Sequence, residues 1–397
     1  MLRIFSPHTP IDAKLCNSFR LCVNIQKIIP VIWEIVLPHI DRVTSQGLLW
    51  VEEIQWSGKG MSGNKIGFAV GYDKNATIRE MAASIAAAEG AGFDSGFFSE
   101  TLYTNRDSVS AMTAFGLATE RMSLGTTQVV RLRSPLVMAQ TAATIDELTG
   151  GRFALTIGAC THKHAARNGL PHLAPPQVLR EYITAIRLLL AGGEVNYAGE
   201  HVVMEKTGLN WQPLRKDIPI WIAGASRLGL TIAGQMADGI LLDAATSPEY
   251  AANAIAIIRQ AREAVGLSME GFTVAQLVNV SLGDSKSEAL DAVRWEIASK
   301  FRYASTAKSK IAVGEPNLAQ DAPEVLSALF EEKGFEALVE AIPDSYVDAL
   351  TASGTLPQVV ERLNRYRAAG VTLPLVRAAS VSQIPTLLDS VTALREG

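Results

Sequence analysis

A cysteine followed closely by four basic side chains is the most reactive grouping in the sequence. Cys160 ends an apolar run, and the polar segment after it contains His162, Lys163, His164 and Arg167. Positive charge near a partly exposed thiol favours the thiolate, which is the nucleophilic form. The grouping indicates either a reactive site, with His164 near a bound phosphate or substrate, or a small buried cysteine beside a solvated loop.

A glycine turn leads from an apolar run into a helical pattern at residues 222–229. Such a turn brings backbone N–H groups and the positive end of a helix dipole to one place, where a phosphate can bind. Gly224 permits close approach, Ser226 can cap the helix and Arg227 adds positive charge. With Ala225 they form a candidate phosphate site; the alternative is an ordinary turn with a serine cap.

Other polar residues stand where apolar runs end. Glu100 could act as a general acid or base, orient a hydrogen bond, or be a solvated loop carboxylate. The ends of two further runs carry Thr126, Thr127, Gln128 and Gly158. In a parallel barrel, side chains at the C-terminal ends of the strands gather at one face. We therefore expect these residues to share a site.

The pair His162 and His164 could also be read as a metal site. A two-metal site of a barrel hydrolase needs further ligands at later strand ends. The remaining histidines are His8, His39, His172 and His201, and none of them follows an expected strand. No lysine ends an expected strand either, which disfavours a Schiff-base aldolase. We expect no metal site.

Eight apolar segments of strand length alternate with helical patterns, which is typical of βαβ units. They span residues 66–72, 95–99, 122–129, 152–159, 218–224, 239–243, 272–282 and 371–378. The first intervening helix opens with a capping box formed by Thr77 and Glu80. We expect a closed (β/α)8 TIM barrel. A doubly wound open sheet is disfavoured because no GxGxxG follows the first strand.

Two excursions should enlarge the barrel. Residues 194–197 and 200–204 flank Ala198-Gly199 and indicate a hairpin after strand four. A mostly helical insertion is expected between strands seven and eight, from residue 284 to about 353. Long connections on the catalytic face commonly determine substrate choice.

The composition disfavours several kinds of partner. The chain has 397 residues, a formal net charge of −4 and an isoelectric point near 5.9. No basic field attracts nucleic acid or a membrane surface, and the apolar run at 28–37 is too short and interrupted to span a bilayer. Three cysteines are too few for a disulfide framework, so we expect a cytoplasmic protein.

The first sixty residues lack the regular periodicity found from Asn64 onward. The codons of Gly58-Lys59-Gly60 must be purine-rich, like a ribosome-binding site, and Met61 follows directly. We therefore expect an irregular extension over residues 1–60, a single barrel domain over 61–397, and translation starting at Met61. A genuine N-terminal extension is the alternative.

Residues 146–152 read Asp-Glu-Leu-Thr-Gly-Gly-Arg. This segment resembles the luciferase-like superfamily, in which the same helix typically ends in Asp-Glu-Leu-Ser/Thr-Gly-Gly-Arg. The superfamily includes bacterial luciferase, FMN-dependent monooxygenases and methylenetetrahydromethanopterin reductases that use coenzyme F420. The turn at Gly224 resembles the Ala-Gly-x-Ser-x-x-Gly of FMN-dependent members. Residues 103–107 look similar to the reductases, but the histidine of the Asp-His that those reductases typically carry near Glu100 is absent.

The resemblance implies a flavin- or deazaflavin-dependent oxidoreductase that acts on a small organic substrate. With FMN the implied reaction is monooxygenation by O2, and with coenzyme F420 it is direct hydride transfer. A non-catalytic flavin-binding protein is the alternative. The implied catalytic residues are Glu100, Cys160 and His164, and the implied cofactor-binding residues are Thr126, Thr127, Gln128, Gly158, Cys160, Gly224, Ala225, Ser226 and Arg227.

Three structural details also follow from the resemblance. Bacterial luciferase has a cysteine at the end of the same strand, so Cys160 is expected to contact the flavin ring. Members dimerise through barrel helices, which implies a homodimer. Many have a non-prolyl cis peptide at the end of strand three, expected here at Thr127–Gln128. Such a bond costs roughly 2.5 to 4 kcal/mol, so it persists only where function uses it.

Overall fold

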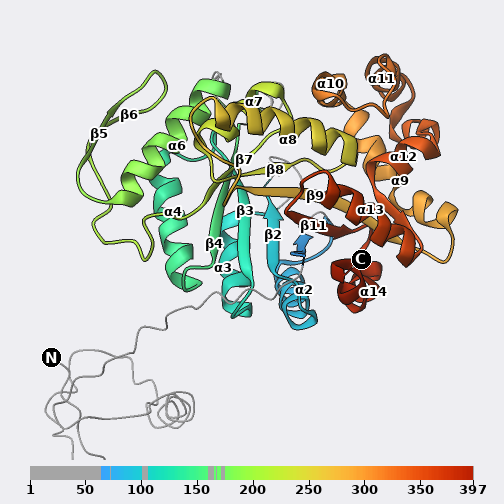
Figure 1. Ribbon diagram of the computed structural model, residues 1–397, viewed down its shortest axis with the longest axis horizontal. Coiled ribbons are helices and arrows are strands. Elements are labelled where there is room, and N and C mark those ends of the chain that lie inside the picture. The colour runs from blue at the N-terminus through green and yellow to red at the C-terminus, as the bar shows by residue number, and fades with distance from the viewer. Residues whose placement is uncertain are drawn as a thin grey trace, which may run out of the picture. The chain divides into compact units, whose positions relative to one another are not determined.

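The computed structural model describes residues 64–71, 73–100, 106–159, 165–166, 168–170 and 175–396. The expected extension over residues 1–60, the start at Met61 and two candidate site residues, Cys160 and His164, lie outside these ranges. In the described part of the chain, eight parallel strands close into a barrel with helices around it (Figure 1).

All eight expected barrel strands are present. They are β1 (Gly67–Val70), β2 (Ser95–Ser99), β3 (Ser123–Val129), β4 (Phe153–Gly158), β7 (Ile220–Ala223), β8 (Gly239–Leu242), β9 (Thr273–Leu282) and β11 (Leu373–Ala378). Each pairs in parallel with its neighbour, and pairing of β11 with β1 closes the barrel. The prediction of a (β/α)8 barrel is confirmed.

Helices cover the outside of the barrel. They are α2 (Ile78–Ala91), α3 (Ser108–Ala118), α4 (Pro135–Leu148), α6 (Pro175–Ala191), α7 (Arg227–Met236), α8 (Pro248–Glu263), α13 (Leu356–Ala368), η4 (Val381–Gln383), α14 (Ile384–Asp389) and α15 (Val391–Glu396). The capping box that begins α2 is present, because the Thr77 N–H donates to Glu80 and the Glu80 N–H donates to Thr77. Helix α2 ends at Gly92, whose φ of 108° favours glycine.

The hairpin after β4 is confirmed, but its turn is longer than expected. Strands β5 (Val195–Ala198) and β6 (Val203–Thr207) are antiparallel and lie beside α6 (Figure 1). The carboxylate of Glu181 on α6 accepts hydrogen bonds from the N–H groups of residues 200–202. These N–H groups are therefore held in the turn and cannot extend β6.

The expected insertion between the last two barrel strands contains four helices, which lie together at one side of the barrel in Figure 1. They are α9 (Lys286–Phe301), α10 (Ala304–Val313), α11 (Ala322–Ala341) and α12 (Asp344–Leu350). The sequence did not predict β10 (Ala352–Gly354), which follows them. Strand β9 is ten residues long and outruns β8, so β10 pairs with the backbone groups of β9 that β8 leaves free.

Aromatic side chains fill the interior of the barrel near the N-terminal ends of the strands. They occupy space beside glycines, which have no side chain. A Cβ at Gly239 would lie 2.6 Å from Trp221, and one at Gly125 would lie 2.8 Å from Phe97. A larger apolar cluster lies between the strands and the helices. None of the helices that the structure describes is both long and apolar enough to cross a membrane.

Candidate functional site

Small side chains line one half of the barrel mouth, at the C-terminal ends of the strands. The strand registers place Ala69, Thr127 and Ala223 in one inward-facing layer with Leu277. Gly158 lies directly above it, because a Cβ there would be 3.6 Å from both Thr127 Cγ2 and Ala223 Cβ, an ordinary contact distance. The side of the mouth formed by Ala69, Thr127, Gly158 and Ala223 is therefore lined, in the described residues, by side chains no larger than threonine.

The end of β3 brings only one of its three candidate side chains into this space. Thr127 pairs with the inward-facing Thr156, and its hydroxyl is buried without a hydrogen-bond partner among the described residues. Gln128 pairs with Ile157, which belongs to the cluster beneath the helices. Gln128 and Thr126 therefore face the helix layer, where the Thr126 hydroxyl donates to the Phe98 carbonyl at 2.8 Å.

The expected cis bond between Thr127 and Gln128 is absent, and that prediction is wrong: the described residues contain no cis peptide. Strand β3 instead continues in regular parallel register with β4 as far as Val129, opposite Gly158. The trans backbone thus satisfies its ladder hydrogen bonds to the strand's end.

Glu100 is the centre of a buried network immediately after β2. Its carboxylate accepts hydrogen bonds from the Ser108 hydroxyl and the Val129 N–H, both at 2.9 Å. Arg133 Nη1 contacts both carboxylate oxygens, at 2.7 and 2.8 Å, and Nη2 reaches Asp107 at 2.9 Å. The network joins the ends of β2 and β3 to the start of α3, and leaves the carboxylate few open positions for a proton relay.

The turn from β7 into α7 leads into a helix N-terminus that a serine caps. Ser226 caps α7, accepting a hydrogen bond from the Gly229 N–H at 3.2 Å. Ser226 and Arg227 are exposed, and Gly224 is half-buried. The hydroxyl of Tyr250 on α8 donates to the Ala225 carbonyl at 3.1 Å and fixes the turn. The positive end of the helix is therefore accessible to an anion.

Charged side chains form the opposite wall of the mouth, a part of the site that the sequence reading missed. Arg377, at the end of β11, donates to Asn279 Oδ1 on β9 through Nε at 3.0 Å, and Nη2 lies 2.8 Å from Glu296 on α9. All three side chains are at least nine-tenths buried. The sequence feature that could have identified this wall is an arginine near the C-terminal end of the last barrel strand, because side chains at these strand ends line the barrel mouth.

A second charged group stands beside β8. Asp243 follows β8 and contacts Lys310 at 3.1 Å and Lys300 at 3.6 Å. Burial opposes ionisation of Asp243, but the two lysines outweigh it and hold the pKa of that carboxyl well below its usual range. Lys310 Nζ also donates to the carbonyls of Ala244 and Ala245. These contacts hold α9 and α10 of the insertion against the C-terminal end of β8.

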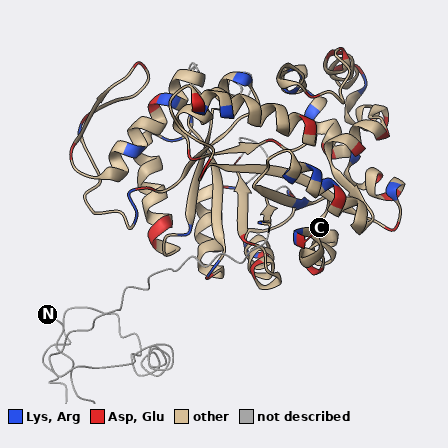
Figure 2. Cartoon of the chain, viewed as in Figure 1, with Lys and Arg blue, Asp and Glu red and all other residues tan. Residues whose placement is uncertain are grey.

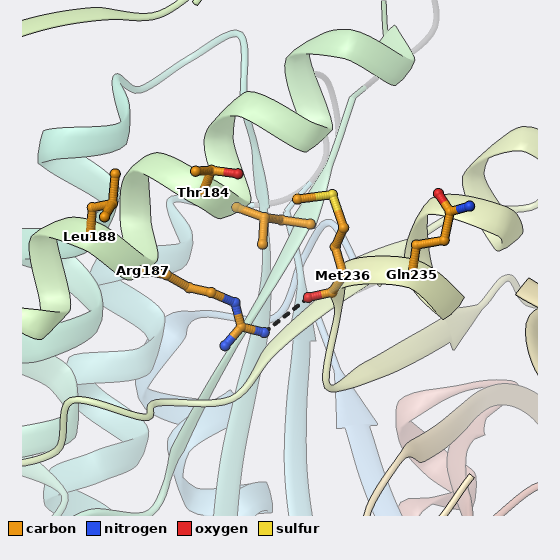
Figure 3. A pocket seen from close by; sticks show the side chains of 6 residues that line it. Thr184, Arg187, Leu188, Gln235 and Met236 are labelled. Carbon is orange, nitrogen blue, oxygen red and sulfur yellow. Dashed lines mark hydrogen bonds between the residues drawn. The ribbon is translucent and has the colours of Figure 1, made fainter. Parts of the chain in front are cut away.

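A separate surface cavity of about 390 Å³ lies between α6 and α7 (Figure 3). Its lining includes Thr184, Leu188 and Met236, and Arg187 donates to the Met236 carbonyl at 3.0 Å. No candidate residue lines this cavity. The described residues contain no cluster of side chains suited to hold a metal ion, and the barrel mouth remains the candidate site.

Comparisons with known proteins show the family of the chain. The sequence model of the family described as luciferase-like monooxygenase matches residues 61–373. A 5,10-methylenetetrahydromethanopterin reductase from Archaeoglobus fulgidus is 27% identical over 311 residues, covering 77% of this chain and 91% of the relative. A putative coenzyme F420-dependent oxidoreductase from Mycobacterium tuberculosis is 28% identical over 345 residues, covering 82% and 98%.

The fold comparison points the same way. The solved structure of a coenzyme F420-dependent tetrahydromethanopterin reductase from Methanopyrus kandleri superposes with a TM-score of 0.71 at 20% identity. The match covers 83% of this chain and 97% of that one. At this identity the likeness concerns the fold.

Proposed function

The chain belongs to the luciferase-like monooxygenase family, and we propose that it is an oxidoreductase that binds coenzyme F420 in the barrel mouth and acts on a small organic substrate. The observation that carries this proposal is the small-residue wall at Gly158, next to an exposed helix N-terminus at Ser226 on the neighbouring strand connection. The names of the Mycobacterium and Methanopyrus proteins, which include coenzyme F420, support the choice of cofactor.

The residues present fit such a cofactor. A planar ring needs a flat, small-residue surface, which Gly158, Thr127 and Ala223 supply. The buried Thr127 hydroxyl lacks a partner among the described residues and would gain one from a polar ring atom. The turn at Gly224 and Ser226 would hold the phosphate with its N–H groups.

Coenzyme F420 in its reduced form would supply a hydride when bound, and the protein would position its ring and cover it. Glu100 holds the end of β3 through the Val129 N–H and thereby fixes Thr127 against the ring. We assign Glu100 this positioning role. Cys160 remains the proposed ring contact, and His164 the proposed contact to cofactor phosphate or substrate.

A second candidate function is FMN-dependent monooxygenation. The sequence Gly224-Ala225-Ser226 resembles FMN-dependent members, and the exposed cap of α7 suits a terminal phosphate. The two functions differ in their use of oxygen. Reduced cofactor should be assayed with a panel of small aldehydes and ketones, and oxidised F420 with small alcohols, each with and without O2. Turnover of F420 without O2 supports the first proposal, strict O2 dependence with FMN supports the second, and binding without turnover would favour a storage role.

Ser226→Ala is expected to weaken F420 binding about tenfold, because it removes a hydroxyl and loosens the N-terminus that faces the phosphate. Ser285→Ala removes an equivalent cap from α9, where Ser285 accepts from the Glu288 N–H. Both variants should lose about 1 kcal/mol of stability. Fluorescence titration should show the loss of affinity for Ser226→Ala alone; equal F420 affinity in the two variants would exclude the phosphate role.

We propose a homodimer formed through the outer faces of α2, α3 and α4. Helix α3 has no charged residue (Figure 2), and its Leu117 is 73% exposed. The exposed residues of α2 and α4 include three charged ones at or near helix ends, Arg79, Glu80 and Glu147; the others are uncharged, namely Ala83, Ala87, Gly90, Val137, Gln140, Thr144 and Leu148. Outer helix faces with few charges and with exposed apolar side chains are typical of surfaces buried against another chain.

Leu117→Asp is therefore expected to convert the dimer to a monomer, because it places a charge in an apolar contact. Sedimentation velocity at micromolar concentration would measure this. Val325→Asp, at an exposed position on α11 in the insertion, is the matched control and should leave the dimer intact. A monomeric wild-type protein would contradict the proposal.

We further propose that residues 1–60 are dispensable and that the protein is cytoplasmic. The match to the family begins at residue 61, and the described barrel begins at Gly67. A protein consisting of residues 61–397 is expected to unfold at the same temperature and bind F420 with the same affinity as the full chain. Insolubility of the shortened protein would assign the extension to the core.

A further inference from the structure

Asn279 carries a buried hydrogen-bond donor with no described partner. The residue is 1% exposed, and Nδ2 has no hydrogen-bond partner among the described residues. Buried amide groups are nearly always paired in folded proteins, so an orphaned donor calls for an explanation.

The orientation of the Asn279 amide is fixed by its neighbours. Arg377 donates to Oδ1 through Nε at 3.0 Å and Nη2 at 2.5 Å. A guanidinium has donors only, so the atom facing it must be the amide oxygen. Glu296 holds the guanidinium in place at 2.8 Å. Nδ2 is consequently the atom directed away from the ion pair.

The side chain of Asn279 belongs to the interior of the barrel mouth. Ala275 and Leu277 of β9 lie in the interior cluster, and alternation along the strand puts Asn279 on the same face. Its register partner Arg377 follows Leu375 of the same cluster in the same way. The donor thus lies on the wall across from Thr127 and Gly158, where the ring is proposed to bind.

We propose that Asn279 Nδ2 donates a hydrogen bond to a neutral oxygen of the substrate, such as that of a ketone, aldehyde or alcohol, and holds it against the cofactor. A neutral amide suits a neutral oxygen, because the charge of Arg377 is already matched by Glu296. This assignment rests on the proposed function. Asn279 is then a substrate-binding residue that the sequence motifs do not reveal.

The test uses full-length protein and Asn279→Asp, which keeps the shape of the side chain and its pairing with Arg377 but removes the donor. Protein is first titrated with reduced F420, and the loaded protein is then titrated with acetone while oxidation of the cofactor by hydride transfer to the ketone is followed by absorbance and fluorescence. We expect the F420 dissociation constant to change by less than about twofold and the half-saturating acetone concentration to rise about tenfold or more.

The matched control is Asn364→Asp on α13. Asn364 Oδ1 also accepts a hydrogen bond from an arginine, Arg367 Nη1 at 2.9 Å, but lies on an outer helix. Both titrations of Asn364→Asp should match those of the wild type.

Unchanged acetone response in Asn279→Asp, or no response in loaded wild-type protein, overturns the inference. Loss of F420 affinity in Asn279→Asp would assign the donor to the cofactor instead. Failure of wild-type protein to bind F420 at all is a separate result, which overturns the proposed function and this inference with it.

Discussion

Replacing Gly158 by leucine is expected to abolish tight F420 binding while the barrel stays folded. A Cβ at this position would make only ordinary contacts with Thr127 and Ala223, and the φ angle of Gly158 lies outside the left-handed region. The rest of the leucine side chain must then extend into the mouth and occupy the place of the ring. We expect the dissociation constant to rise more than about 100-fold, or about 2.7 kcal/mol.

Gly158→Ala is the matched control, because its methyl group fits at the 3.6 Å contact distance. It should bind F420 nearly as wild type does. Thermal unfolding would establish that both variants are folded, and fluorescence titration would measure binding. Wild-type affinity in the leucine variant would mean that the ring binds elsewhere.

Replacing Arg133 by methionine is expected to cause the largest loss of stability among these variants. The side chain of Glu100 is 5% exposed and that of Arg133 14%, and two of their contacts are shorter than 3 Å. Removing one partner of a buried ion pair leaves the other charge uncompensated, which typically costs about 3–5 kcal/mol. Because Glu100 also holds the end of β3, affinity for the cofactor should fall as well.

Chemical denaturation of four variants tests this prediction, namely Arg133→Met, Glu100→Gln, their combination and the control Arg121→Met. Arg121→Met removes an exposed arginine 4.0 Å from Glu89 and should change stability by less than about 1 kcal/mol. The double variant Arg133→Met with Glu100→Gln should be less destabilised than the sum of the single changes, because no buried charge remains. A cost below about 1 kcal/mol for Arg133→Met would show that the pair is solvated.

The barrel could be predicted because most of its strands are short segments rich in apolar residues, bounded by turn residues and alternating with helical patterns. Strand β10 could not, since its three residues pair only because β9 outruns β8. The turn of the hairpin was misjudged for a similar reason. It depends on Glu181, which is distant in sequence and supplies the acceptor for three N–H groups.

The site could be predicted where local sequence determines it, as at the cap of α7 by Ser226 and the opening at Gly158. At the end of β3, the sequence marked a polar cluster but not which face each side chain takes, because that depends on the register with β4. Asn279 and Arg377 were missed because they meet only when β9 and β11 pair, 98 residues apart in the chain.

Whether the barrel mouth binds coenzyme F420 is measured most directly by a parallel titration of the full-length protein with F420 and FMN. Both cofactors change their fluorescence or absorbance on binding, so one method serves for both. We expect F420 to bind with a dissociation constant in the micromolar range and FMN to bind at least about tenfold more weakly. Preferential binding of FMN, or binding of neither cofactor, would contradict the proposed binding of F420.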